Sequence, residues 1–231
     1  MPGGPVTKTR TVISNHPQGS HTNSIKTIRT TEGLVQLVIP ASSVGKPSRG
    51  GGLPKSPVFY NPRTKLSRDI GVLFLKAVLT KSCDGISVCE PLAGCGVRGL
   101  RYAKETHLTG SLLLNDRSPL AYRFVKRNIK LNRLQRNVTA ADEEANVLLS
   151  HESARGERFD FIDIDPFGSP LPYIHSALNA LKRVSYVALT ATDTAALCGT
   201  AKRACLRRYA ATPLYTEYKH EIGLRILVAS L

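Results

Sequence analysis

Residues 159–170 join a predicted strand to a turn that carries a carboxylate. The segment Phe159–Ile164 alternates apolar and acidic residues, as a β-strand does, and Pro166, Gly168 and Pro170 end the alternation. Asp165 therefore stands at or near the carboxyl end of a buried strand. In an open parallel sheet, this end of the strands is where ligands bind.

The tripeptide Asp165-Pro166-Phe167 has the chemistry to recognise an amino group. Its carboxylate and the carbonyl of Pro166 can accept hydrogen bonds from an exocyclic amine, and the Phe167 ring can stack on the attached base. An acid followed by Pro and an aromatic is the pattern of enzymes that methylate such amines. The alternative is an ordinary strand end, because Asp is a common turn residue.

A glycine pattern upstream indicates a nucleotide-type cofactor. Gly94, Gly96 and Gly99 match G-x-G-x-x-G, and Asp116 follows the next predicted strand, where an acid can hold ribose hydroxyls. Both features fit NAD and S-adenosylmethionine equally. Glu90, at the preceding strand end, favours S-adenosylmethionine, as does the amine-recognising motif, which a dehydrogenase does not need.

Glu143 and Glu144 follow the next predicted strand, at residues 138–141. This position allows the two acids to meet the edge of an adenine ring. Acids are also common at helix N-termini, where they interact favourably with the helix dipole. The sequence leaves both readings open.

The elements that must position these residues alternate between strand and helix, which predicts a parallel α/β sheet with right-handed crossovers. The predicted strands are 86–89, 112–114, 138–141, 159–164 and 184–191. One predicted helix ends near residue 107. The others cover 119–132, 145–149, 172–181 and about 202–209. Residues 217–231 are predicted as a helix, with a strand as the alternative.

The N-terminal part divides into a flexible basic arm, residues 1–24, and a region of strands, loop and helix, residues 25–81. The core is predicted at 82–231, truncated at its C-terminus. Residues 25–39 predict short strands, and 65–81 predict a helix. Spacing in that helix suggests that one apolar stripe is buried. The stripe consists of Ile70, Leu73, Phe74, Ala77 and Val78.

The composition predicts a polyanionic partner. The chain has 32 Lys and Arg residues against 17 Asp and Glu residues, a net charge of +15, which favours nucleic acid binding. The five cysteines form no Cys-x-x-Cys pair, so we expect a reducing compartment and no metal site. No membrane segment or secretion signal is visible. We expect a cytoplasmic monomer.

Taken together, these motifs resemble the tRNA (guanine(26)-N(2))-dimethyltransferase family over about residues 30–231. The block Asp165–Pro170 is the most specific part of the resemblance. The matching segments are Val58–Pro62, Arg68-Asp69, Gly96–Glu105, Asn115-Asp116, Asp165–Pro170, Thr190–Asp193, Leu197–Gly199, and His220-Glu221 with Arg225.

The resemblance implies a class I methyltransferase domain, Rossmann-like with helices on both faces of the sheet, followed in the family by a C-terminal domain. We expect the last strands and that domain to be missing here. Two departures keep the charge: Glu90 stands where the family usually has Asp, and Glu143-Glu144 stand where it has paired Asp.

The resemblance also implies roles in holding S-adenosylmethionine. Arg68 and Arg98 would hold its methionine carboxylate, because a guanidinium group can bind a carboxylate through two hydrogen bonds. Asp116 would take the ribose hydroxyls. The remaining residues of the implied cofactor site are Glu90, Gly94, Gly96, Glu143, Glu144 and Ala145.

For the substrate, the resemblance implies that the guanine N2 amine of tRNA, at position 26, donates to Asp165 and to the Pro166 carbonyl. Phe59 and Phe167 would stack on either side of the flipped base, and the amine would be methylated once and then again. From the residues alone, Phe59 reads as ordinary core packing.

Three other functions fit parts of the sequence. A methyltransferase acting on another DNA or RNA amine would share the cofactor site, although such enzymes usually have Pro-Pro-Tyr/Phe. A non-catalytic RNA-binding remnant would fit the charge but need not keep the site residues. An NAD dehydrogenase would fit the glycines, but no pair of hydride-transfer residues supports it.

Overall fold

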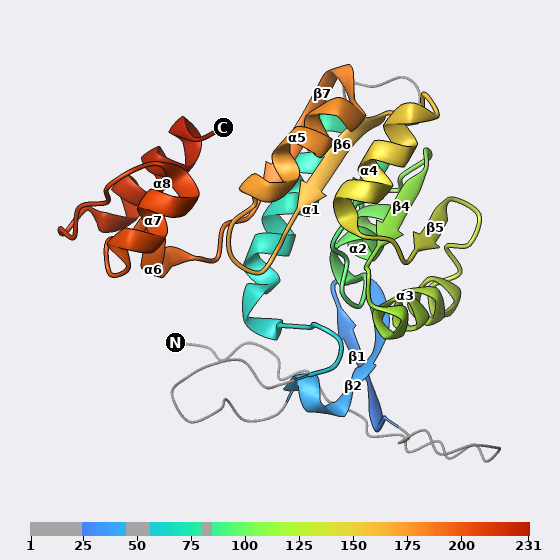
Figure 1. The fold of residues 1–231 in the computed structure, drawn as a ribbon. Helices are drawn as coiled ribbons and strands as arrows, with labels where there is room; N and C mark the ends of the chain where they lie inside the picture. The colour runs from blue at the N-terminus through green and yellow to red at the C-terminus, as the bar shows by residue number, and fades with distance from the viewer. Residues whose placement is uncertain (1–24, 45–55, 80–84) are drawn as a thin grey trace. The chain divides into compact units, whose positions relative to one another are not determined.

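The computed structural model describes residues 25–44, 56–79 and 85–231, and the predicted arm at 1–24 lies outside this part (Figure 1). The chain divides into two compact units. The first comprises Met1–Ile86 with Ala93–Asp142, and the second comprises Ser87–Leu92 with Glu143–Leu231. Elements on both sides of residue 82 therefore share a unit.

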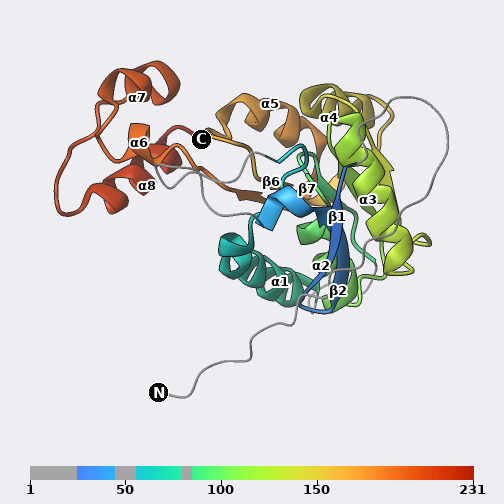
Figure 2. The same cartoon turned by 90° about the horizontal axis from the view of Figure 1, so that it is seen from below.

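In the described part of the chain, five strands form the main sheet, which is mostly parallel, with helices between its strands (Figures 1 and 2). The pairs β4–β5, β3–β6 and β6–β7 are all parallel. This arrangement confirms the predicted Rossmann-like α/β class. In sheet order, the strands are β5 (Val138–Ala141), β4 (Leu112–Asn115), β3 (Val88–Glu90), β6 (Phe159–Ile164) and β7 (Leu181–Leu189).

The first unit adds an antiparallel hairpin, β1 (Thr27–Glu32) and β2 (Val35–Pro40), as the sequence predicts for 25–39. The hairpin turns at Gly33, whose positive φ of 56° favours glycine. The helical elements of this unit are η1 (Ala41–Val44), η2 (Pro62–Thr64), α1 (Lys65–Leu79), α2 (Val97–Glu105) and α3 (Pro119–Leu131).

Helix α3 holds the hairpin with two asparagine side chains that imitate a neighbouring strand. The Asn128 Oδ1 accepts from the Val38 N–H at 2.7 Å, and its Nδ2 donates to the Val38 carbonyl at 3.2 Å. Asn132, one turn later, makes the same pair of bonds with Gln36 at 2.9 and 2.7 Å. The i, i+4 spacing in the helix thus matches the i, i+2 spacing of one strand edge.

The predicted burial of α1 is wrong. Ile70 and Leu73 of the predicted stripe are 58% and 65% exposed, whereas Val72 and Leu75 are buried. The buried side of α1 also includes Arg68, whose charge is neutralised by Glu32. Apolar periodicity missed this side because one of its members is a paired arginine.

The second unit contains a helical pair and a helical cluster. Helices α4 and α5 pack together, and α4 continues well past the predicted residue 149. Helices α6, α7 and α8 share a core that includes Leu197, Tyr209 and Leu227, and α8 confirms the helical prediction for 217–231. The bounds are α4 (Ala145–Ala154), α5 (Leu171–Ala180), α6 (Thr194–Leu197), α7 (Lys202–Tyr209) and α8 (Lys219–Ala229).

Candidate active site

In the glycine loop after β3, the backbone of Gly94 lies close to the backbone of Phe59. Gly94 and Gly96 have φ of 57° and 80°, a left-handed conformation that side chains disfavour. A Cβ at Gly94 would lie 3.0 Å from the Phe59 carbonyl oxygen, and one at Gly96 would lie 3.3 Å from Leu114. Gly96 also forms the N-cap of α2. The loop therefore depends on both glycines.

Asp116 closes this loop from the end of β4. Its Oδ2 accepts from the Gly94 N–H at 2.9 Å, and its Oδ1 accepts from the Ser118 N–H at 3.0 Å. The carboxylate is half-buried, and each oxygen retains acceptor capacity. The structure thus brings together Phe59, Gly94 and Asp116, three residues that the sequence singled out separately. Their arrangement fits a cofactor that carries ribose hydroxyls.

The two predicted arginines differ in their partners. The Arg98 Nη2 lies 3.5 Å from the Ser67 Oγ. Arg68 places its Nε and Nη2 each 2.6 Å from the carboxylate of Glu32. It also donates to the Thr64 hydroxyl and the Asn61 carbonyl. The Glu32 carboxylate therefore engages two of the three guanidinium nitrogens of Arg68.

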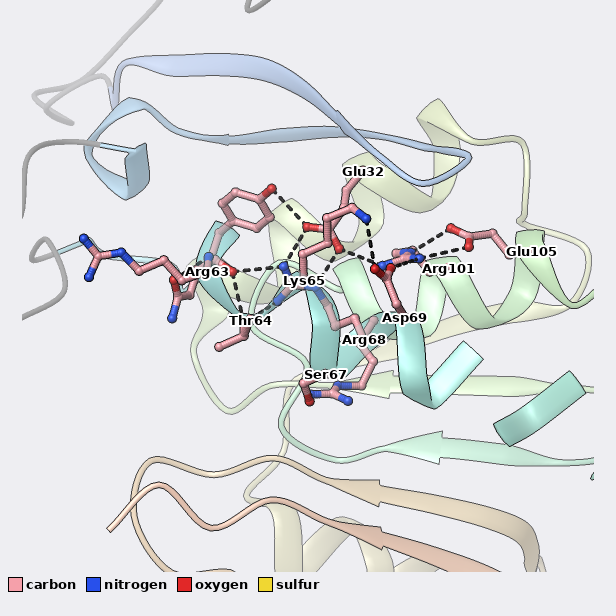
Figure 3. A network of polar contacts seen from close by, with 12 residues as sticks. Glu32, Arg63, Thr64, Lys65, Ser67, Arg68, Asp69, Arg101 and Glu105 are labelled. Atoms are coloured by element: carbon pink, nitrogen blue, oxygen red, sulfur yellow. Dashed lines mark hydrogen bonds and ion pairs between the residues drawn. The ribbon is translucent and has the colours of Figure 1, made fainter. Parts of the chain in front are cut away.

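Glu32 is the centre of a buried polar network (Figure 3). Besides Arg68, it accepts from Arg101 at 3.1 Å and from the Tyr60 hydroxyl at 3.1 Å. Burial, together with the Glu32 carboxylate, raises the Tyr60 pKa, so this tyrosine stays a donor. Glu32 is not among the residues predicted for the site, although it is the single acid in residues 1–60, which was a usable signal.

Arg101 extends the network to two further carboxylates. It lies 2.6 Å from Asp69 and 2.7 Å from Glu105. Desolvation raises the Glu105 pKa, but hydrogen bonds from Arg101 and from the Leu34 N–H outweigh it, so the net pKa is lowered. The network thus joins the hairpin to α1 and α2, the helices that carry Arg68 and Arg98.

In the second unit, the predicted adenine-edge acids have structural partners. Glu144 is the N-cap of α4 and accepts from the N–H groups of Asn146 and Val147 at 2.8 and 3.0 Å. Glu143 lies 2.9 Å from His151. Ala145 is buried as the first residue of α4, and Glu90 is buried at the end of β3. Helix capping by Glu144 supports the alternative that the sequence left open.

The predicted catalytic turn follows β6 directly. Asp165 is half-buried, Pro166 is buried, and Phe167 is 78% exposed. Gly168, with φ of 93°, donates its N–H to the Thr192 hydroxyl at 2.7 Å and accepts from the Thr192 N–H at 2.9 Å. Thr192 therefore fixes the turn from the segment after β7.

The same turn is connected to helix α7. Tyr209 donates to Asp193, the residue after Thr192, at 2.7 Å. Burial raises the Tyr209 pKa to about 12; a hydrogen bond with Ser169 opposes this shift and the bond to Asp193 adds to it. Within the second unit, the structure therefore holds Asp165–Ser169 with residues 192–193 and α7.

Among the described residues, no group of three or more His, Cys, Asp and Glu side chains could hold a metal ion. No helix in the described part of the chain has the length and apolar character needed to cross a membrane.

A family model described as N2,N2-dimethylguanosine tRNA methyltransferase matches residues 43–231. The tRNA (guanine(26)-N(2))-dimethyltransferase of Pyrobaculum aerophilum is 46% identical over 85% of this chain and 51% of its own. The enzyme of that name from Methanocaldococcus jannaschii is 47% identical over 75% of this chain and 47% of its own. The chain thus spans about half the length of these relatives.

Among solved structures, the complex of Trm1 from Pyrococcus horikoshii with S-adenosyl-L-methionine superposes with a TM-score of 0.75. The two chains are 38% identical, and the match covers 88% of this chain and 53% of that one. A tRNA m1G37 methyltransferase of M. jannaschii, at 15% identity and a TM-score of 0.51, shares the fold.

Proposed function

Because this chain belongs to the N2,N2-dimethylguanosine tRNA methyltransferase family, we propose that it methylates the exocyclic N2 amine of a guanine in tRNA, at position 26, using S-adenosylmethionine. The turn after β6 is the observation that carries this proposal. It presents a carboxylate next to an aromatic ring that is 78% exposed, as recognition of a stacked base and its amine requires.

The glycine loop supports S-adenosylmethionine as the cofactor. Its glycines let a ligand approach the backbone, and Asp116 offers acceptors for ribose hydroxyls. In this proposal, Arg98 holds the methionine carboxylate. Arg68 then acts through its position, since it donates four of its five N–H groups to Glu32, Thr64 and Asn61.

The other predicted cofactor residues also contact S-adenosylmethionine in this proposal. Glu143 and Glu144 would meet the adenine beside the buried Ala145, with Glu144 also capping α4. Glu90, at the end of β3, would complete the cofactor site. When bound, S-adenosylmethionine supplies a methyl group on a sulfonium that is a good leaving group.

For the substrate, the chain must place and orient the amine. The Asp165 carboxylate and the Pro166 carbonyl would accept its two N–H groups, which would orient the nitrogen lone pair toward the methyl donor. Phe59 and Phe167 stack on the base. When the nitrogen forms its bond to carbon it gives up one proton, and the Asp165 carboxylate accepts it.

We also propose that the protein works in a reducing compartment such as the cytoplasm, where tRNA is available. Four described cysteines, at positions 89, 95, 198 and 205, are buried thiols that belong to no disulfide, which supports this location.

The test is mass spectrometry of nucleosides from unmodified tRNA incubated with the 231-residue chain and labelled S-adenosylmethionine. Labelled N2-methylguanosine or N2,N2-dimethylguanosine is the expected product. Calorimetry with S-adenosylmethionine runs in parallel. Cofactor binding without product would locate the deficit in tRNA binding, whereas the absence of both would refute the proposed activity for this chain.

A further inference from the structure

Helix α3 presents a face made of cations. Arg123, Lys126, Arg127 and Lys130 follow three- and four-residue spacing, so their side chains leave the same side of the helix. All four are exposed. Three further exposed arginines flank the helix at positions 117, 133 and 136. We call Arg123, Lys126, Arg127 and Lys130 the basic face of α3.

No acid accompanies this face: residues 117–141 contain neither Asp nor Glu. Exposed cations on two other helices do have acidic neighbours, in the pairs Lys65–Asp69 of α1 and Arg225–Glu221 of α8. A helix serving only solubility would gain from such pairs, since they stabilise it and cations alone repel one another. The basic face therefore carries a cost that an anionic partner would offset.

The opposite side fixes α3 in place. Phe124, Val125 and Ile129 are buried, and Asn128 and Asn132 bond to β2. The cations thus stand on a rigid element at set spacings, from Arg123 to Lys130 over ~10 Å of helix axis. A rigid array of this kind suits a regular polyanion.

The composition of α3 distinguishes between two anionic partners, a membrane surface and a nucleic acid. A helix that lies on a membrane exposes large apolar side chains beside its cations. In α3, the Leu, Ile, Val and Phe side chains are buried or half-buried, and Lys126 lies over the Tyr122 ring at 5.2 Å. The face thus offers phosphate contacts without an apolar wedge, which favours nucleic acid.

We propose that the basic face of α3 binds the phosphate backbone of the tRNA substrate. This inference rests on the proposed function, which supplies tRNA as the partner. It concerns affinity and positioning of the tRNA, because phosphate contacts of this kind carry no base identity.

The test is fluorescence anisotropy of unmodified tRNA at several salt concentrations, with the intact chain and two triple variants. R123Q/K126Q/K130Q removes three charges from the basic face. R155Q/K182Q/R225Q removes three charges that are paired with acids elsewhere. The first variant should lose about tenfold or more in affinity at 0.1 M salt, and its slope of log K against log salt should fall by roughly two to three. The second should stay within about twofold of the intact chain.

Thermal melts check that both variants remain folded. Equal losses in the two variants, or an unchanged slope in the first, would overturn the inference. Stronger binding of the intact chain to phosphatidylserine vesicles than to tRNA would overturn it too. Calorimetry with S-adenosylmethionine separates the two proposals: a chain that binds tRNA through α3 but neither binds cofactor nor forms product refutes the activity alone.

Discussion

Two loops follow the neighbouring parallel strands β3 and β6, and they are built differently. In the loop after β3, Ala93, Gly94, Cys95 and Gly96 are all buried, and bonds from Asn115, Asp116 and Asn128 hold it. In the loop after β6, Asp165 is half-buried and Phe167 is exposed.

The difference shows which half of the proposed site is preorganised by the fold. The loop after β3, the proposed cofactor loop, is held by three residues of its own unit, so its shape is present before any ligand binds. The loop after β6, the proposed substrate loop, leaves its largest apolar side chain in water, and covering Phe167 with a base would return the hydrophobic free energy that exposure costs. We therefore expect substitutions in the two loops to affect different steps.

The largest expected effect comes from the substrate loop. Asp165→Ala should lower the rate of methyl transfer by about 10²–10⁴-fold, because it removes an acceptor for the amine and for its proton. The affinity for S-adenosylmethionine should not change. Single-turnover kinetics and calorimetry measure the two quantities. Asp160→Asn, at the other end of β6 and paired with Lys182, is the control and should keep its rate. Loss of cofactor binding in Asp165→Ala would mean that Asp165 is structural.

The next largest effect is expected in the buried polar network around Glu32, which lies in the first unit. Glu32→Ala should lower the free energy of unfolding by ~3–5 kcal/mol, because it leaves the buried Arg68 and Arg101 without their shared carboxylate. Urea denaturation measures this change. The control is Glu221→Ala on α8, whose carboxylate is 57% exposed and should cost less than about 1 kcal/mol. Equal costs would show that the network adds nothing to the rigidity of this unit.

The third comparison uses the two asparagines of α3. Both Asn128→Ala and Asn132→Ala should cost about 1–3 kcal/mol of stability, because each exposes bonding groups of β2. Only Asn128 also donates to the Cys95 carbonyl in the glycine loop, at 3.0 Å. Calorimetry should therefore show several-fold weaker cofactor binding for Asn128→Ala alone. Equal weakening in both variants would indicate a general effect of instability.

The smallest expected effect tests the support of the substrate loop. Thr192→Val removes the hydroxyl that accepts from the Gly168 N–H, which should cost about 1 kcal/mol in the transition state, or about fivefold in kcat. Thr200→Val removes a hydroxyl bonded to the Ala195 carbonyl in the helical cluster and serves as the control. A rate unchanged in Thr192→Val would show that the turn keeps its shape without this bond.

Local elements were predictable where the apolar pattern agrees with the residues that begin or end a helix or strand. Strand β5 matches the predicted 138–141, and Ser118-Pro119 marks the start of α3, with Ser118 accepting from the Ala121 N–H. The order of strands and helices along the chain predicted the α/β class. These features depend on neighbours in sequence, which a pattern can record.

Contacts between distant residues were not predictable in the same way. Glu32 and Arg68 are 36 residues apart, and nothing local in the sequence shows that one neutralises the other. The burial of α1 was wrong for the same reason, since an arginine paired in this way can occupy a core-facing position. For Glu143 and Glu144 the sequence allowed two interpretations, because an acid at a helix start and an acid beside a ligand look alike in sequence.

The amide pairs of Asn128 and Asn132 have a consequence for behaviour at high concentration. An open strand edge is a template on which strands of other molecules can pair and aggregate. On the edge of β2 that the two asparagines cover, the N–H and carbonyl groups of Gln36 and Val38 are already bonded. This side of the hairpin therefore cannot recruit a strand from another molecule unless α3 first moves away.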